Sequence, residues 1–290
     1  MCDEWTAADN DRHLGAMTRR SFATAAAAAG VSVLLPSPAN ALAVKGRDVT
    51  IRTPDGNADA YFVAPASGRH PAVLVWPDIM GLRPAFRRMA DRLAQSGYAV
   101  LTVNQFYRST KTPFVQAGES FDQPAVRQRI EPFRKALTPE GTTRDSIAFV
   151  AFLDAQREVD TGSGVGVTGY CMGGPMMMRT AAANPARVRA GASFHGGGLA
   201  ADGPDSPLLL VPQMKGRYLF AVAENDDARA PGDKDKLAAA FAAAKVPAEI
   251  EVYAGTLHGW CPPDSRAYNP AQAERAWGRL LATLLWTRKT

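Results

Sequence analysis

Short apolar runs separated by helical stretches make up most of the chain from about residue 70 onward. Runs that are apolar on both faces are typical of parallel strands covered by helices. Before them, residues 48–53 and 58–64 flank the turn 54–57, whose Asp-Gly pair favours a hairpin. The six apolar runs are 72–76, 98–103, 165–169, 190–194, 218–223 and 248–253. The pattern predicts an α/β fold: a mainly parallel sheet with an N-terminal antiparallel hairpin and helices on both faces.

Helical spacing of apolar residues appears between the first two runs and again near the C-terminus. A glycine, Gly97, follows the first of these helices as a stop signal. Residues 147–153 are apolar enough to form a well-buried helix, whereas 109–141 combine prolines, glycines and charges without apolar periodicity. We expect 109–141 to pass over the carboxyl edge of the sheet, as lid segments often do. The residues with helical spacing are Phe86, Met89, Ala90 and Leu93, then Trp277, Leu280, Leu281 and Leu284.

Size and charge narrow the class of protein. The 290 residues are 46% hydrophobic, which is enough for one sizeable core. The net charge is +5, but lysines and arginines occur only in pairs or short scatterings. Such a distribution is typical of a solvated surface, so we expect no nucleic-acid partner.

The N-terminal region reads as an export signal. Arg19 and Arg20 precede a stretch of small apolar residues and a proline-containing bend, a pattern that resembles a twin-arginine signal peptide. Small residues at Ala39/Ala41 or Ala41/Ala43 suit a cleavage site. We expect residues 1–43 to be a leader, 44–290 the mature domain, and the protein to be periplasmic. A membrane anchor is the alternative, but the apolar stretch is shorter than the roughly 20 residues that span a bilayer, so no stable insertion is expected after cleavage.

The stretch GVGVTGYCMGG places Cys171 at the turn between a strand and a helix. Small residues on both sides, in the pattern G-x-C-x-G, allow the sharp turn of a nucleophile elbow. The helix dipole would favour the thiolate, and the amide of Met172 could face a developing oxyanion. One alternative is a small buried hydrophobic residue. A dinucleotide-binding G-x-G-x-x-G is a poor match, because no acidic residue occurs about 20 positions later, near Arg189.

A nucleophile elbow requires a later carboxylate and then a histidine. His258 follows the last predicted strand, whereas His195 precedes any suitable aspartate. Asp226 comes first after the penultimate apolar run, and Asp227 is the alternative. The histidine would exchange protons with Cys171 and the leaving alkoxide, and the aspartate would orient its ring. His195 begins HGGG, an oxyanion motif that elsewhere precedes the nucleophile, so here we expect a packing or pocket-wall role.

Four segments together resemble the dienelactone hydrolase (carboxymethylenebutenolidase) family of α/β-hydrolases, over residues 45–290. They are VWPDIMGLRP, GYCMGGP, AENDDARAP and LHGWCPPDSRAYN. The resemblance implies an α/β-hydrolase fold and a triad of Cys171, Asp226 and His258. It also implies hydrolysis of a small ester or enol-lactone through a thioester acyl-enzyme, with no metal and no organic cofactor.

The resemblance assigns further roles near the nucleophile. Asp78 stands where the better-known members carry a glutamate that restrains the resting thiol; a cap for the helix beginning near Pro84 is the alternative. Ile79 would donate the second oxyanion amide beside Met172. Family arginines that bind a substrate carboxylate suggest Arg108.

Two more substrate contacts follow from the resemblance, Tyr107 beside Arg108 and Arg266 in the loop after His258. Their spacing differs from the family pattern, so solvated arginines are the alternative. We expect a monomeric or weakly dimeric hydrolase; a thiol-redox or ligand-binding protein on the same fold is the competing hypothesis, and a nicotinamide enzyme a third. Cys261 lies close to His258 in sequence and could pair with Cys171 or leave both thiols free.

Overall fold

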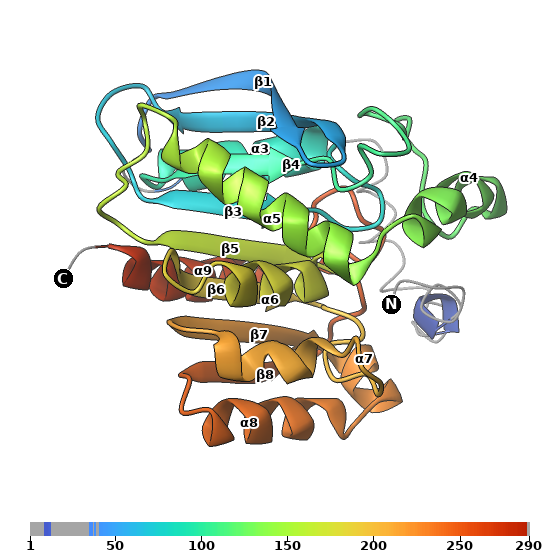
Figure 1. Cartoon of the computed structure of the whole chain (residues 1–290). Coiled ribbons are helices and arrows are strands. Elements are labelled where there is room, and N and C mark those ends of the chain that lie inside the picture. The colour runs from blue at the N-terminus through green and yellow to red at the C-terminus, as the bar shows by residue number, and fades with distance from the viewer. Residues whose placement is uncertain (1–8, 13–34, 37, 39–40, 289–290) are drawn as a thin grey trace.

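The structure is a computed structural model that describes residues 9–12, 35–36, 38 and 41–288. Eight strands form one sheet in the order β1-β2-β4-β3-β5-β6-β7-β8 (Figure 1). β2 pairs antiparallel with β1 and β4, and all later neighbours are parallel. The predicted hairpin and mainly parallel sheet are confirmed. The strands are β1 (Val44–Thr53), β2 (Gly56–Pro65), β3 (Ala72–Trp76), β4 (Ala99–Val103), β5 (Val165–Tyr170), β6 (Val188–Phe194), β7 (Arg217–Ala223) and β8 (Ala248–Tyr253).

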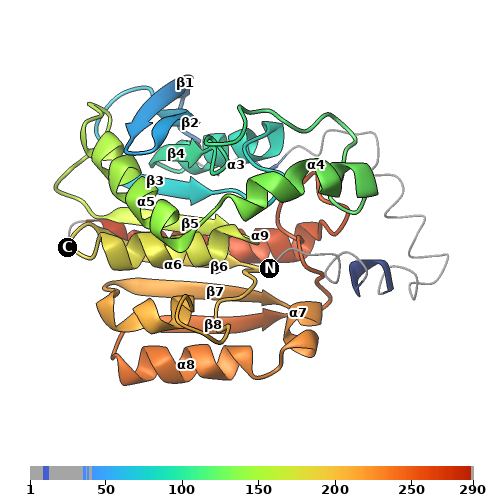
Figure 2. The same cartoon turned by 45° about the vertical axis from the view of Figure 1, so that its right-hand side comes forward.

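Helices cover both faces of the sheet (Figures 1 and 2). α3 (Pro84–Gln95) and α9 (Pro270–Leu284) pack on one face, where their apolar residues join a core with β3, β6 and β7. α5 (Pro139–Asp154), α6 (Gly173–Ala183) and α8 (Asp233–Ala243) cover the other face. The predicted helical spacings near residues 86 and 277 are thereby confirmed.

Smaller helices complete the fold around the carboxyl ends of the strands. α7 (Glu224–Arg229) follows β7 directly, and α4 (Pro124–Lys135) lies within the predicted excursion. Figure 1 shows α4 away from the sheet, beyond the ends of its parallel strands. Two short 3-10 helices, η1 (Pro207–Gln213) and η2 (Leu285–Thr287), lie after β6 and α9.

α5 corrects one detail of the sequence prediction. The helix begins at Pro139, where Thr138 caps it by accepting a hydrogen bond from the Gly141 amide at 3.0 Å. Residues 139–141 therefore belong to α5 and not to the excursion. Phe149 and Leu153 are buried, but Ile147 is 51% exposed, because it lies on the outer side of the helix. Residues 147–153 do form part of a helix, as predicted, but only some of their apolar side chains face the core.

The predicted leader falls mostly outside the described residues, since 1–8, 13–34, 37 and 39–40 are not described. The export signal and its cleavage site therefore stay predictions. Among the helices that the structure does describe, none has the length and hydropathy needed to cross a bilayer.

Candidate active site

The turn after β5 has the geometry predicted for a nucleophile elbow. Cys171 adopts a φ of 54°, a left-handed conformation that is strained for a residue with a side chain. Its amide donates to the Phe194 carbonyl at 3.0 Å, and its carbonyl accepts from the Gly174 amide at 3.0 Å. A Cβ on Gly169 would overlap the backbone of Gly173, and one on Gly173 would overlap the Trp76 carbonyl. These close approaches explain why the flanking residues are glycines.

The structure shows neither a disulfide between Cys171 and Cys261 nor two free thiols, the two states expected from the sequence. Cys171 is disulfide-bonded and only 2% exposed. Cys261 is a free, buried thiol, so the two are not joined to each other. Burial raises the pKa of the Cys261 thiol well above its ordinary value. Cys171 must therefore be reduced before its sulfur can act as a nucleophile.

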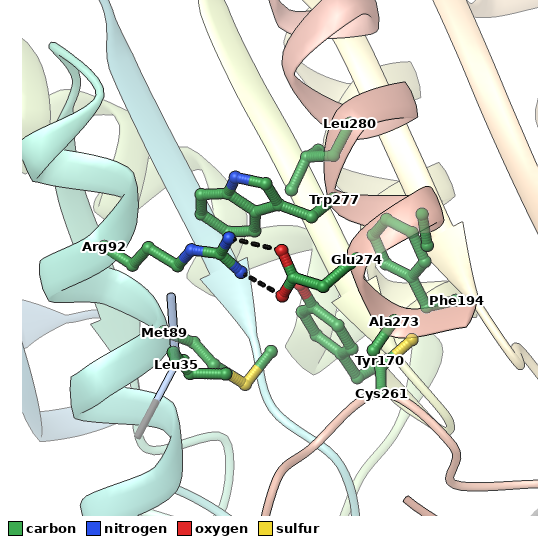
Figure 3. Close-up of a pocket in the computed structure, with 11 residues that line it drawn as sticks. Leu35, Met89, Arg92, Tyr170, Phe194, Cys261, Ala273, Glu274, Trp277 and Leu280 are labelled. Carbon is green, nitrogen blue, oxygen red and sulfur yellow. Dashed lines mark hydrogen bonds and ion pairs between the residues drawn. The ribbon is translucent and has the colours of Figure 1, made fainter. Parts of the chain in front are cut away.

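Cys261 lies in a small hollow between α3 and α9, although it follows His258 by three residues in sequence (Figure 3). The guanidinium of Arg92 and the carboxylate of Glu274 form a two-point ion pair beside it, at 2.7 and 2.6 Å. Cys261 belongs to the apolar core of this face, whereas Cys171 belongs to a separate apolar cluster. The sequence spacing therefore does not bring the two thiols into one site.

Asp226 and His258 meet as the predicted strand order requires. Asp226 lies in the first turn of α7, and its Oδ2 is 2.7 Å from Nδ1 of His258. Burial alone would raise the pKa of Asp226, but attraction and hydrogen bonding to His258, together with Arg229, lower it. The carboxylate is thus held ionised against the imidazole, which fixes the ring orientation.

Asn225 fixes the backbone of the histidine loop, a role that was not predicted. Its Oδ1 accepts from the amide of His258 at 2.8 Å, while its Nδ2 donates to the side chains of Asp9 and Asn10. Asn10 in turn donates to the His258 carbonyl at 2.8 Å. Residues 9–12, which belong to the predicted leader, therefore contact the loop that carries His258. The adjacency of Asn225 to Asp226 is the one sequence signal that could have drawn attention to it.

His195 lies beside His258, the candidate catalytic base. Its ring is completely buried, and its centre is 5.1 Å from that of His258 in an edge-to-face arrangement. Neither ring nitrogen has a hydrogen-bond partner among the described residues. Burial, and secondarily the neighbouring His258, lower the pKa of His195 well below its ordinary value. A neutral imidazole therefore packs against His258, and a role in the wall of a pocket stays a prediction.

The sulfur of Cys171 lies within what we call the nucleophile cluster, a group of apolar side chains contributed by the loop after β3 and by the excursion. Both predicted oxyanion residues, Ile79 and Met172, belong to it. In addition to Cys171, its buried members are Ile79, Met80, Phe106, Val115, Val126 and Ile130, and its partly buried members are Phe114, Phe121, Phe133, Leu137 and Met172. The structure thus brings the elbow, the proposed oxyanion loop and the excursion together.

Asp78 follows β3 and is nearly buried, at 8% exposed. Its carboxylate accepts from the guanidinium of Arg83 at 2.6 and 3.0 Å and from the Met80 amide at 2.9 Å. The same guanidinium binds the carboxylate of Asp264 at 2.7 and 2.9 Å. Arg83 thereby joins the loop after β3 to the loop after His258. The restraint of the thiol by Asp78 stays a prediction.

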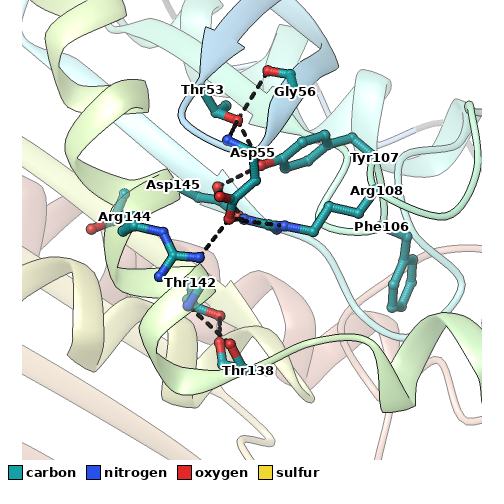
Figure 4. Close-up of polar contacts among 12 residues, drawn as sticks. Thr53, Asp55, Gly56, Phe106, Tyr107, Arg108, Thr138, Thr142, Arg144 and Asp145 are labelled. Atoms are coloured by element: carbon teal, nitrogen blue, oxygen red, sulfur yellow. Dashed lines mark hydrogen bonds and ion pairs between the residues drawn. The ribbon is translucent and has the colours of Figure 1, made fainter.

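Tyr107 and Arg108 are held in a polar cluster between the β1–β2 turn and α5 (Figure 4). The Tyr107 hydroxyl donates to Asp145 at 2.7 Å and lies 2.7 Å from the Thr53 hydroxyl. The guanidinium of Arg108 donates to Asp145 at 2.7 and 2.8 Å and to Asp55 at 2.5 Å. The contact of Tyr107 and Arg108 with substrate stays a prediction. The polar groups that they meet in the structure belong to other residues of the protein.

Arg266 lies on the surface, 56% exposed, where its guanidinium pairs with the carboxylate of Asp122 in the excursion. It also lies 3.9 Å from Asp11. The pair links the histidine loop to the segment before α4. The contact of Arg266 with substrate likewise stays a prediction.

The sequence alone does not predict the ion pairs of Arg83 and Arg108, because their partners are distant in the chain. Asp264 lies 181 positions from Arg83 and Asp145 lies 37 from Arg108. No local pattern encodes such pairs. Within the described ranges, His, Cys, Asp and Glu form no group of three that could hold a metal ion.

Known proteins of one family resemble this chain over most of its length. The dienelactone hydrolase family matches residues 58–286. A putative carboxymethylenebutenolidase of Methylorubrum extorquens is 27% identical over 263 residues, covering 89% of this chain and 86% of the relative. A probable 2-oxo-3-(5-oxofuran-2-ylidene)propanoate lactonase of Bradyrhizobium is 27% identical, with 78% and 88% covered. The crystal structure of a putative dienelactone hydrolase from Klebsiella pneumoniae shares the fold with a TM-score of 0.71, at 23% identity and coverages of 84% and 99%.

Proposed function

Because the chain belongs to the dienelactone hydrolase family, and is a hydrolase of esters or lactones, we propose that it acts through Cys171, His258 and Asp226. The hydrogen bond of 2.7 Å between Asp226 and His258 carries this proposal. It joins two residues 32 positions apart at the ends of adjacent strands, in the order that follows a nucleophile elbow.

The reaction begins with reduced Cys171. His258 accepts the thiol proton, and the thiolate attacks the carbonyl carbon of the substrate. The amides of Ile79 and Met172 stabilise the oxyanion, and His258 then protonates the leaving alkoxide. Water, deprotonated by His258, attacks the thioester, and collapse of the tetrahedral intermediate releases the carboxylic acid and the Cys171 sulfur. The imidazolium of His258 then returns its proton to that sulfur. Asp226 steadies the imidazolium in both steps.

The test is hydrolysis of 4-nitrophenyl acetate by the full chain, kept reduced with a phosphine reductant. We expect Cys171→Ala to abolish catalysis above background while circular dichroism shows the parent fold. Cys261→Ala is the matched control, since it removes the other described thiol from a separate core; it should keep most of the activity. Equal rates in Cys171→Ala and the parent would overturn the proposal.

A second candidate, thiol-redox chemistry on the same fold, is favoured by one observation: Cys171 is disulfide-bonded. The same preparations separate it from the first. Ester turnover that appears on reduction and persists without any redox partner supports hydrolysis, whereas a reduced protein without esterase activity that reduces a model disulfide supports the redox role.

For localisation, we propose export by the twin-arginine route, supported by the arginine pair before the apolar stretch. Replacing Arg19 and Arg20 with lysine should leave the full-length chain in the cytoplasm of a bacterial host. A shortened chain in the periplasmic fraction of that variant would contradict the assignment.

A further inference from the structure

Apolar side chains pack around Cys171. The nucleophile cluster contributes aliphatic and aromatic side chains, and its buried members are at most 8% exposed. Val115, Val126 and Ile130 reach the cluster from the excursion. A substrate that binds at Cys171 must displace some of these side chains and then contact the rest. The surface that it meets is therefore suited to apolar groups.

The segment after β4 separates apolar from charged side chains. Phe106 packs in the nucleophile cluster, whereas Arg108 turns away into the polar cluster with Asp55 and Asp145. Figure 4 shows the ring of Phe106 pointing away from these polar groups. Arg144 pairs with the same Asp55, so two guanidinium groups there meet two carboxylates. Arg108 has no excess charge to offer a substrate carboxylate.

The charge beside the oxyanion loop is negative. One buried guanidinium, Arg83, lies between the carboxylates of Asp78 and Asp264, which gives a formal charge of −1. Ile79, a member of the nucleophile cluster, directly follows Asp78 in the chain. An additional carboxylate held near Ile79 would be repelled by this group.

The remaining arginines of this region also meet acceptors. Arg266 pairs with Asp122, and Arg127 donates to the backbone carbonyl of Asp122 at 2.9 Å. The charge of Arg266 is thus paired with a carboxylate of the protein, whereas Arg127 meets a backbone carbonyl.

We propose that the enzyme prefers esters whose acyl group is uncharged and apolar, and discriminates against acyl groups that carry a carboxylate. The inference rests on the proposed ester hydrolysis at Cys171. A carboxylate entering the cluster would lose its hydration without gaining a cation, whereas an apolar acyl chain replaces the packing of the displaced side chains.

The test compares two esters of nearly equal shape, 4-nitrophenyl 6-methylheptanoate and the mono-4-nitrophenyl ester of adipic acid. The first carries an isopropyl group where the second carries a carboxylate. With the reduced full chain we expect kcat/KM to be at least about 100-fold higher for the neutral ester. Equal rates, a preference for the adipate ester, or hydrolysis of acetate without hydrolysis of either long ester would overturn the proposal.

Asp264→Asn tests the electrostatic part. It removes one of the two carboxylates on Arg83, so kcat/KM for the adipate ester should rise by about 3- to 10-fold with little change for the neutral ester. Asp48→Asn is the matched control: it removes the same charge from an exposed residue on the outer strand β1 and should leave the ratio unchanged. A ratio unaffected by Asp264→Asn would show that this charge does not set the preference.

Ile130→Ala tests the apolar part. This completely buried residue of α4 belongs to the nucleophile cluster, so its truncation should change kcat/KM for the long neutral ester more than for the acetate ester. Equal effects on both esters would contradict a contact with the acyl chain. Loss of Cys171-dependent turnover of the acetate ester in the parent would instead overturn the proposed function itself.

Discussion

The surroundings of His258 and the Arg108 cluster are both polar, yet they differ in how completely their hydrogen-bonding groups are satisfied. In the Arg108 cluster, the guanidinium groups of Arg108 and Arg144 meet the carboxylates of Asp55 and Asp145, so two positive charges balance two negative ones. The hydroxyl of Tyr107 donates to Asp145. Next to His258, by contrast, both ring nitrogens of His195 lack a hydrogen-bond partner among the described residues. Matched groups stabilise a fold, whereas buried polar groups without a partner are rare and occur preferentially near functional sites.

The largest effect should come from His258→Ala. Without the imidazole no group exchanges the thiol proton, so kcat/KM for 4-nitrophenyl acetate should fall by about 10³-fold. The effect on the fold should be small by comparison, as monitored by urea unfolding. A fall of less than tenfold in the reduced enzyme would place the proton transfer elsewhere.

Arg108→Met should reduce stability more than activity, the reverse of His258→Ala. Removing the guanidinium leaves the carboxylate of Asp145, which is 2% exposed, without its charge partner, so the free energy of unfolding should drop by about 3 kcal/mol. Urea denaturation measures the change.

Arg144→Met serves as the control for this variant, because its half-exposed guanidinium pairs with the same cluster through Asp55 and should cost less than about 1 kcal/mol. Similar losses in the two variants would contradict the view that burial makes the Arg108 cluster structural.

Asp226→Asn should give the smallest change, in the pH dependence of stability. The folded protein lowers the pKa of Asp226 below its ordinary 3.8, so this carboxylate stabilises the fold above that pH. The contribution is lost as the pH falls through the folded pKa. The difference in unfolding free energy between parent and variant, about 1 kcal/mol at neutral pH, should therefore shrink below pH 4. A difference that stays constant down to pH 2 would contradict the shift.

Sequence patterns predicted the fold and the elbow well because both depend on local rules. Alternating hairpin residues and apolar runs specify the sheet, and glycines around Cys171 reflect backbones that approach too closely for a side chain. The pairing of Asp226 with His258 was also predictable, since the carboxyl ends of parallel strands meet at one edge.

The arginines were not predictable in the same way. Arg83 and Arg108 carry no local signal of their partners, and their roles depend on which distant carboxylates the fold brings within reach. The resemblance implies that Arg108 binds substrate, which stays a prediction, but it gives no sign of the contacts of Arg108 with Asp55 and Asp145. The redox state of Cys171 likewise depends on spatial proximity and not on spacing in the chain.

The most direct test of the central claim is the mass of the intact protein during turnover. Reduced enzyme is mixed with 4-nitrophenyl acetate, quenched in acid within milliseconds and analysed by mass spectrometry with peptide mapping. We predict one acetyl group on Cys171, removable by hydroxylamine at neutral pH as a thioester is, and present in Cys261→Ala but absent from Cys171→Ala. Turnover without any adduct on Cys171, or with the acetyl group on another residue, would contradict the account.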